Sequence, residues 1–270
     1  MKEKYSQLFS NVKEIQPLVH HMTNYVTVND CANITIAIGA SPIMADEIAE
    51  MEEFVNISQA LVLNIGTINE RVLKSMLVAG KIANKKNVPV ILDPVGVGAS
   101  QFRNQALERL LDCVQFSCIK GNVSEIRFLA GLSSKTRGVD ADIRDEMTSE
   151  DLANMAKKLA EKLESVIVIT GVVDTVADCE NVYLIKNGHE KLSSISGTGC
   201  MSASLLGAFI GANPSERVLS SVLAITSMGI AGEIASEKTR GNGSFKVALH
   251  DEISCLDIQT FNDRERIISL

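Results

Sequence analysis

A short glycine-rich turn that ends in a cysteine is the stretch of this sequence best suited to chemistry. Gly197 and Gly199 flank Thr198, and Cys200 follows directly at the start of a helical pattern. Glycine lets backbone N–H groups converge on a ligand, and a helix N-terminus adds roughly half a unit of positive charge. The turn therefore predicts a pocket for phosphate oxygens. Its spacing matches neither the Walker motif nor the dinucleotide fingerprint.

Cys200 itself has three interpretations. The first turn of a helix favours thiolate, which could accept a proton from an attacking alcohol. A free cysteine is more commonly a small buried apolar residue. A nucleophilic cysteine of a hydrolase or transferase would need a histidine and a third orienting group. No such partner is recognisable, because His189 and His250 are isolated and His20 and His21 follow a short apolar run.

Asp93 and Glu125 are the candidate metal carboxylates. Mg²⁺ favours one or two carboxylates together with water and substrate phosphates. Asp93 follows an apolar run, whereas Glu125 could equally cap a helix. Lys120 and Thr170 also follow apolar runs. Ligands of open parallel sheets bind beyond the carboxyl ends of the strands, so these residues together predict a phosphate and metal site along one sheet edge.

The elements that would position these residues alternate along the chain. Short apolar runs predict buried strands over residues 60–65, 88–92, 115–119 and 165–169. Helical patterns cover residues 68–86, 104–112, a short stretch from about 123, and 150–164, where Thr148 opens a capping box. This alternation is typical of right-handed βαβ units. We expect a three-layer α/β fold, with a mostly parallel central sheet flanked by helices.

The regions on either side of these alternating elements show other patterns. Apolar residues from Tyr5 to Ile15 fall at helical spacing, and Pro17 ends that helix. A strand over residues 182–185, followed by a turn over residues 186–189, predicts an edge hairpin. From Gly197 onward the pattern is wholly helical. The apolar tract over residues 199–212 is shorter than the ~20 residues a membrane span needs, so we expect a buried helix there.

Bulk properties favour a single domain over residues 1–270. The chain has 46% hydrophobic residues and a net charge of -7, which gives no support for nucleic-acid binding. Its six cysteines form no CxxC pair, and the charged N-terminus lacks the apolar stretch of a signal peptide. We expect reduced thiols, a cytoplasmic location and no membrane association.

Eight sequence blocks, in order, resemble the hydroxyethylthiazole kinase family of the ribokinase-like superfamily. The blocks are Thr23–Val26, Gly39–Ala45, Leu63–Thr67, Leu92–Ala99, Gly121–Ile126, Arg137–Asp140, Gly197–Cys200 and Gly241–Phe245. The resemblance implies a ribokinase-like fold and ATP-dependent phosphorylation of 4-methyl-5-(2-hydroxyethyl)thiazole, with Mg²⁺ as cofactor. It also implies a homotrimer with active sites at subunit interfaces.

The resemblance also implies roles for single residues. Cys200 would be the catalytic base, at a position where ribokinase relatives usually have Asp. The family commonly has Arg where this chain has Lys120, which keeps the charge but loses the bidentate fork. Through the resemblance, Asn24, Met44 and Gly197 match substrate-binding positions, Lys120 and Thr170 match ATP-contacting positions, and Asp93 and Glu125 match Mg²⁺-associated acidic positions.

Two other functions stay open on the sequence alone. One is the cysteine-dependent hydrolase or transferase built on Cys200. The other is a non-catalytic protein that binds a nucleotide or senses a metabolite. Formation of ADP separates the kinase from both.

Overall fold

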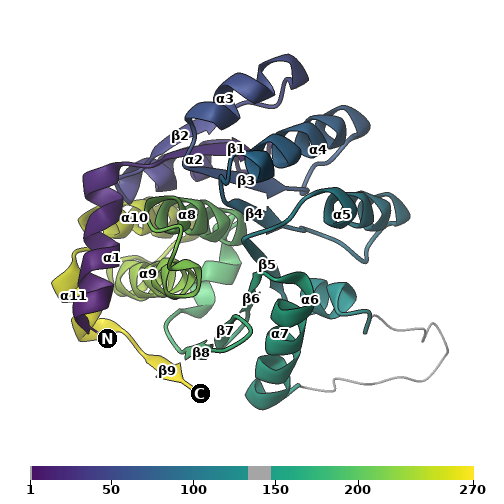
Figure 1. Ribbon diagram of the computed structural model, residues 1–270. Helices are drawn as coiled ribbons and strands as arrows, with labels where there is room; N and C mark the ends of the chain where they lie inside the picture. The colour runs from purple at the N-terminus through teal and green to yellow at the C-terminus, as the bar shows by residue number, and fades with distance from the viewer. Residues whose placement is uncertain (1, 133–146) are drawn as a thin grey trace.

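The computed structural model describes residues 2–132 and 147–270 (Figure 1). The block Arg137–Asp140 lies outside the described residues. The helices are α1 (Lys2–Ile15), α2 (Val28–Ala37), α3 (Met51–Ile57), α4 (Glu70–Lys85), α5 (Gln101–Cys113), α6 (Val123–Leu129), α7 (Ser149–Leu163), α8 (Thr198–Ala212), α9 (Arg217–Lys238), α10 (Asn242–Cys255) and α11 (Ile258–Arg264). The strands are β1 (Leu18–Met22), β2 (Ser41–Met44), β3 (Ala60–Asn64), β4 (Val90–Asp93), β5 (Cys118–Asn122), β6 (Val166–Thr170), β7 (Asp174–Ala177), β8 (Val182–Ile185) and β9 (Ile267–Ser269).

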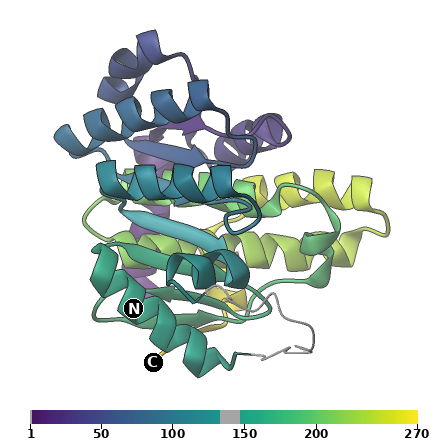
Figure 2. The same cartoon turned by 90° about the vertical axis from the view of Figure 1, so that its right-hand side faces the viewer.

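The strands form one sheet across the described residues, in the order β2-β1-β3-β4-β5-β6-β7-β8-β9. Pairing is parallel from β2 to β6 and antiparallel from β6 to β9. Every residue of β3 and β4 is buried, as expected for strands covered on both faces. Helices lie on both sides of the sheet in Figures 1 and 2. The predicted three-layer α/β fold is confirmed.

Two apolar layers hold the helices against the sheet. On one side α1, α8 and α11 share an aromatic cluster, in which the Phe9 ring lies 5.7 Å from Phe209 and 5.9 Å from Phe261. On the other side Leu73, Leu107 and other apolar residues of α4, α5 and α7 pack against the central strands. Burial of these apolar surfaces makes the main favourable contribution to the free energy of folding, and it fixes the ends of the strands relative to α8.

Two predictions for the second half of the chain are wrong. The hairpin turn precedes Val182 rather than following it, because the Asp178 carboxylate accepts hydrogen bonds from the N–H groups of Glu180 and Asn181 and closes the turn between β7 and β8. The region after Gly197 is not wholly helical either. Its last strand, β9, pairs antiparallel with β8 and is too short for an alternating pattern to show.

Strands β1 and β2 were not predicted from the sequence. His20 and His21 interrupt the apolar run of β1, yet both are buried. Burial lowers the pKa of His21 to about 4, so its ring is neutral at ordinary pH and can sit inside a strand. The signal for β1 was thus hidden by two residues that count as polar in a sequence pattern.

Close packing of α8 on β1 and β3 sets the position of the glycine turn. A Cβ atom added at Gly207 would lie 2.8 Å from a methyl of Val19 and 2.8 Å from a methyl of Val62. The helix is buried from Met201 to Ala212, which agrees with the buried helix expected over residues 199–212 except at its partly exposed first turn. Its neighbour α9 is long and apolar enough to cross a membrane, but 78% of its apolar window is buried within the protein.

The first expected result concerns this packing. We expect Gly207→Ala to lower the free energy of unfolding by about 1–3 kcal/mol, because the added methyl overpacks α8 against two valines. The measurement is urea denaturation followed by circular dichroism. Gly243→Ala is the control, since nothing lies within 4 Å of its added Cβ, and its effect should stay within about 0.5 kcal/mol. Equal stability of the two variants would contradict the packing account.

Candidate active site

The carboxyl ends of the central parallel strands meet along one edge of the sheet. Asn64 at the end of β3 pairs in register with Asp93 at the end of β4, and Asn122 of β5 pairs with Thr170 of β6. The start of α8 faces the same edge. The predicted convergence of strand-end residues is therefore present, even though β1 and β2 were missed.

A cavity of about 570 Å³, here called the central cavity, lies at this edge. It brings together all but one of the residues to which a role was assigned from the sequence, and the exception, Met44, borders another cavity instead. The predicted residues that border the central cavity are Asn24, Asp93, Lys120, Glu125, Thr170, Gly197 and Cys200.

The glycine turn forms one wall of the central cavity. Gly197 has φ +98°, a left-handed conformation that favours glycine, and a Cβ there would lie 2.7 Å from the Cγ2 atom of Thr27. A Cβ at Gly199 would lie 3.0 Å from the Lys120 Nζ atom. The first intrahelical hydrogen bond runs from the Met201 N–H to the Gly197 carbonyl. Earlier N–H groups of α8 have no helical partner and are free to bind an anion beside the Lys120 ammonium.

Cys200 lies in the first turn of α8, and its sulfur accepts two hydrogen bonds. The donors are Asn24 Nδ2 at 3.2 Å and Asn64 Nδ2 at 3.3 Å. The residue is only partly buried and borders the cavity, so its interpretation as a small core residue is wrong. No histidine among the described residues borders the central cavity, which argues against a cysteine–histidine nucleophile.

Asp93 and Lys120 form a buried ion pair at the floor of the cavity. Lys120 Nζ lies 3.3 Å from Asp93 Oδ1, and Asn64 Nδ2 donates to Asp93 Oδ2 at 2.7 Å. Burial raises the pKa of Asp93, and the Lys120 ammonium opposes that rise. Burial alone would lower the pKa of Lys120, but attraction to Asp93, Cys200 and Glu125 outweighs it and raises the pKa. Lys120 therefore carries a positive charge where a phosphate would enter.

Glu125 acts as a capping residue and as a tether between two loops. Its Oε2 atom accepts the Asn122 N–H at 2.8 Å, and the Asn122 side chain accepts the Glu125 N–H, which completes a capping box. Its Oε1 atom accepts the Gly96 N–H at 2.9 Å. The described residues contain no group of three or more His, Cys, Asp or Glu side chains suited to a metal ion. Any divalent cation here would need oxygen atoms from phosphates and water.

A second cavity of about 590 Å³ continues from the central cavity past Thr170. This Ile225 cavity is bordered by residues of β6, β7, α8 and α9 and by the segment after β8, among them Asp174, His189, Ile225 and Met228. Thr170, Ser193, Thr198 and Gly199 border both cavities. Thr170 thus stands at the passage between them, where its hydroxyl donates to the Gly121 carbonyl at 3.4 Å.

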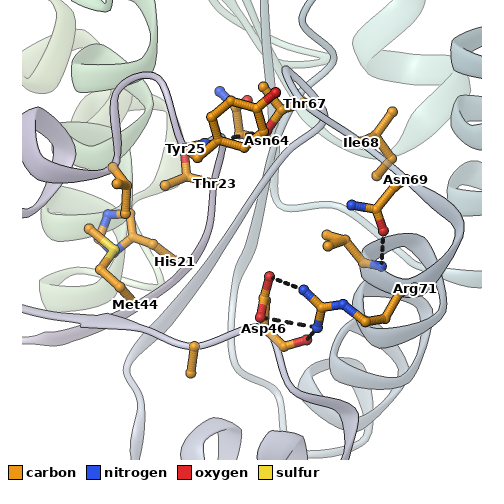
Figure 3. Close-up of a pocket in the computed structure, with 13 residues that line it drawn as sticks. His21, Thr23, Tyr25, Met44, Asp46, Asn64, Thr67, Ile68, Asn69 and Arg71 are labelled. Carbon is orange, nitrogen blue, oxygen red and sulfur yellow. Dashed lines mark hydrogen bonds and ion pairs between the residues drawn. The ribbon is translucent and has the colours of Figure 1, made fainter.

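A third cavity, of about 300 Å³, lies on the other side of the central cavity and contains Met44 (Figure 3). Thr67 borders both of these cavities. The Arg71 guanidinium pairs with the Asp46 carboxylate at 2.8 Å beside this Met44 cavity. The three cavities run in a row along the sheet edge, with the Cys200 sulfur and the glycine turn at the middle one.

Two residues with no predicted role organise this edge. Asn64 bonds to Asp93 and to Cys200, as described above. The Arg103 guanidinium of α5 donates to the backbone carbonyls of Ile65, Gly66 and Val95, and so ties the loops after β3 and β4 together. An arginine directly before the helix predicted over residues 104–112 carries no sequence signal for such a role. In the sequence, Asn64 is distinguished only as a polar residue near the end of a predicted strand.

The class of protein follows from the fold and from this row of cavities. The fold is similar to that of a ribokinase-like superfamily protein from Enterococcus faecalis, with a TM-score of 0.63 and 94% of each chain covered. Sequence identity to that structure is 13%, so the likeness concerns the fold alone. The fold is therefore of the ribokinase-like α/β kind, and the glycine turn and Lys120 border a cavity at the carboxyl edge of its sheet.

The family is shown by closer comparisons. Residues 9–259 match the model of the hydroxyethylthiazole kinase family. A hydroxyethylthiazole kinase of Clostridium beijerinckii is 52% identical, over 94% of this chain and 92% of the relative. The solved structure of a hydroxyethylthiazole kinase protein from Pyrococcus horikoshii OT3 superposes with a TM-score of 0.90 at 34% identity, over 99% of both chains. The chain belongs to the hydroxyethylthiazole kinase family, as its sequence blocks predicted, and it is a kinase.

The buried ion pair gives the second expected result. Lys120→Met keeps the aliphatic stem but leaves Asp93 buried without its counter-charge, which should cost about 3–5 kcal/mol of unfolding free energy. Without Lys120 the folded-state pKa of Asp93 rises further above its unfolded value. The folded state then binds more protons, so stability falls as pH rises through that window. Urea denaturation should show a larger deficit at about pH 8 than at about pH 5.5.

The control is the double variant Lys120→Met/Asp93→Asn, which has no carboxylate to leave unpaired. We expect it to be more stable than Lys120→Met at about pH 8 and to lack the extra pH dependence. If the single and double variants unfold with equal free energies at both pH values, the ion pair does not have the role assigned here.

Proposed function

We propose that this kinase transfers the γ-phosphoryl group of ATP to the hydroxyl of 4-methyl-5-(2-hydroxyethyl)thiazole, a reaction of thiamine biosynthesis. The observation that carries the proposal is the central cavity, where the glycine turn, Lys120 and the Cys200 sulfur border one space. The family supplies the substrate class, since its relatives are hydroxyethylthiazole kinases. We infer that the protein works in the cytoplasm.

The row of three cavities supports an order for the two substrates. The thiazole ring would occupy the Met44 cavity, close to Asn24 and Gly197 on the central side. The nucleoside part of ATP would occupy the Ile225 cavity, with its phosphates passing Thr170 and Lys120. The terminal phosphate would then lie at the glycine turn, between nucleotide and alcohol, in the in-line arrangement that phosphoryl transfer needs.

Cys200 would act as the general base. The alcohol oxygen forms a bond to the γ-phosphorus while the bond from that phosphorus to the bridging oxygen breaks, and ADP leaves with the bond electrons. The alcohol proton passes to the Cys200 sulfur and later to water. The N–H groups at the start of α8 and the Lys120 ammonium stabilise charge on the transferring group. Positioning and electrostatics dominate such a reaction, so a modest base is sufficient.

Mg²⁺ fits this site as a partner of the phosphates rather than as an ion caged by protein. Asp93 and Glu125 border the central cavity, and their carboxylate oxygens keep lone pairs beyond the hydrogen bonds they already accept. These two residues would hold the ion together with phosphate oxygens and water. When bound, Mg²⁺ neutralises part of the negative charge of the polyphosphate.

The direct test is release of ADP in the presence of Mg²⁺, measured over a small panel of alcohols. We expect the thiazole alcohol to give a far higher kcat/KM than pyridoxal or ribose. Binding of ATP and thiazole without ADP would instead indicate a non-catalytic sensor. A covalent adduct between the thiazole and Cys200 would favour the cysteine nucleophile.

Variants at the base give the third expected result. Cys200→Ala should lower kcat by about 10²–10⁴-fold, the usual size of general-base assistance. Cys200→Asp should keep or improve turnover, since a carboxylate is a competent proton acceptor. Cys113→Ala, which removes an exposed cysteine of α5, is the control and should leave kcat unchanged. Complete loss of activity in a folded Cys200→Asp protein would count against the base role.

We further propose a homotrimer with its active sites at subunit interfaces. Tyr25 and Val26, next to the Met44 and central cavities, are 78% and 61% exposed in the single chain. Exposed apolar side chains beside a binding site are typical of an interface.

The fourth expected result follows from this assembly. Light scattering after gel filtration should give a mass three times the 29.1 kDa of one chain. Val26→Asp should lower that mass and raise KM for the thiazole, because the charge would be buried on assembly. Ile57→Asp is the control, since Ile57 is 56% exposed at the end of α3 and borders none of the three cavities. A monomeric wild-type protein with full activity would contradict the proposal.

A further inference from the structure

The orientation of the Asn64 side-chain amide is fixed by its surroundings. Its Oδ1 atom accepts the Gly66 backbone N–H at 2.9 Å. A backbone N–H can only donate, so the oxygen must face it and the NH₂ group must face the other way. That NH₂ group has one N–H directed to Asp93 Oδ2 at 2.7 Å and one to the Cys200 sulfur at 3.3 Å. Asn64 is 2% exposed, so no water is needed to complete these bonds.

The Asn24 amide is fixed in the same way. Its Oδ1 atom accepts both the Thr27 backbone N–H and the Thr27 hydroxyl, each at 3.1 Å. Its NH₂ group therefore faces away from Thr27 and donates to Asn64 Oδ1 at 3.1 Å and to the Cys200 sulfur at 3.2 Å. All polar atoms of the two amides have partners, and the chain of donors runs in one direction, from Thr27 to Asp93.

The Cys200 sulfur consequently accepts hydrogen bonds from two N–H donors. The orientation of these donors is fixed by the bonds that Thr27 and Gly66 donate to the amide oxygens. A thiol is a weak acceptor, whereas a thiolate accepts such bonds strongly, because hydrogen bonds to an ionised group are shorter and stronger than neutral ones. The two amides thus favour the form of sulfur that can take a proton. Cys200 also borders the central cavity, where the acceptor alcohol would lie.

We propose that Asn24 and Asn64 are positioning residues that hold the Cys200 sulfur as a paired hydrogen-bond acceptor, ready to receive the proton of the substrate hydroxyl. The proposal rests on the base role of Cys200 proposed above. Neither amide gains or loses a proton in the step. Asn64 also donates to the Asp93 carboxylate, which pairs with Lys120. Asn64 and Asp93 therefore link the Cys200 sulfur to the Lys120 ammonium.

The first test measures the reactivity of the Cys200 sulfur and does not depend on catalytic turnover. Iodoacetamide labelling of Cys200, followed by peptide mass spectrometry, is measured from pH 6 to 10 for wild type and Asn64→Leu. At pH 7 the variant should label about tenfold more slowly, the effect of losing a hydrogen bond to a charged group. The two rates should converge toward pH 10, because alkaline solution ionises a cysteine thiol whether or not amides donate to it. Equal rates at pH 7, or a constant ratio at all pH values, would overturn the proposal.

The matched control is Asn213→Leu. Asn213 is as buried as Asn24 and donates two hydrogen bonds to backbone carbonyls, but it lies at the opposite end of α8. Its replacement should leave the labelling of Cys200 unchanged. If Asn64→Leu does not fold, Asn24→Leu serves in its place, because it keeps the bond from Asn64 to Asp93 and is expected to slow labelling by a similar factor.

The second test is a double-mutant cycle on kcat. Asn64→Leu should lower kcat by about tenfold or more when Cys200 is present, and by less than about threefold in the Cys200→Ala background. A purely structural role would lower kcat equally in both backgrounds. The two tests separate the two proposals. If the variants show that Cys200 is not the base but labelling is still slower in Asn64→Leu, the amides bond to the sulfur without serving catalysis. If Cys200 is the base but labelling is unchanged, the amides do not position it.

Discussion

The Lys120 ammonium and the first N–H groups of α8 face one cavity in a chain whose net charge is -7. An acidic protein repels a polyphosphate at long range, so the positive potential that holds it has to be local. Lys120 stays charged inside the protein because attraction to Asp93, Cys200 and Glu125 outweighs the cost of its burial. The remaining features of the site follow from the need to hold this pair, the glycine turn and the Cys200 sulfur within a few ångströms.

The scaffold meets that need by fixing α8 and the strand ends separately. The glycine at 207 lets α8 approach β1 and β3 closely, which places its N-terminus over the sheet edge. Arg103 and Glu125 tie the loops after the strands to one another through backbone groups. Asn64 then joins the two parts, because it is bonded both to the β4 carboxylate and to the α8 cysteine.

Much of this arrangement could be predicted from sequence patterns. The apolar runs near β3, β4 and β6 were readable because parallel strands are buried on both faces, and the glycine turn was readable because few other patterns place two glycines before a helix. Strand β1 was not, since buried neutral histidines look polar in a sequence. Most of the partners of Asn64 and Arg103 lie about 30 to 140 positions away in the sequence. A local sequence pattern cannot predict such contacts. Met44 and Asn24 were named only through the family resemblance.

The central claim is that the N-terminus of α8 holds the phosphoryl group as it passes to an alcohol beside Cys200. A crystal structure with ADP, aluminium fluoride and the thiazole alcohol tests this most directly, because the fluoride mimics the transferring group. The account predicts fluorine atoms within hydrogen-bond distance of the N–H groups of residues 198–200, and the alcohol oxygen within reach of the Cys200 sulfur. Binding of the fluoride away from this turn, or an alcohol directed away from the sulfur, would contradict it.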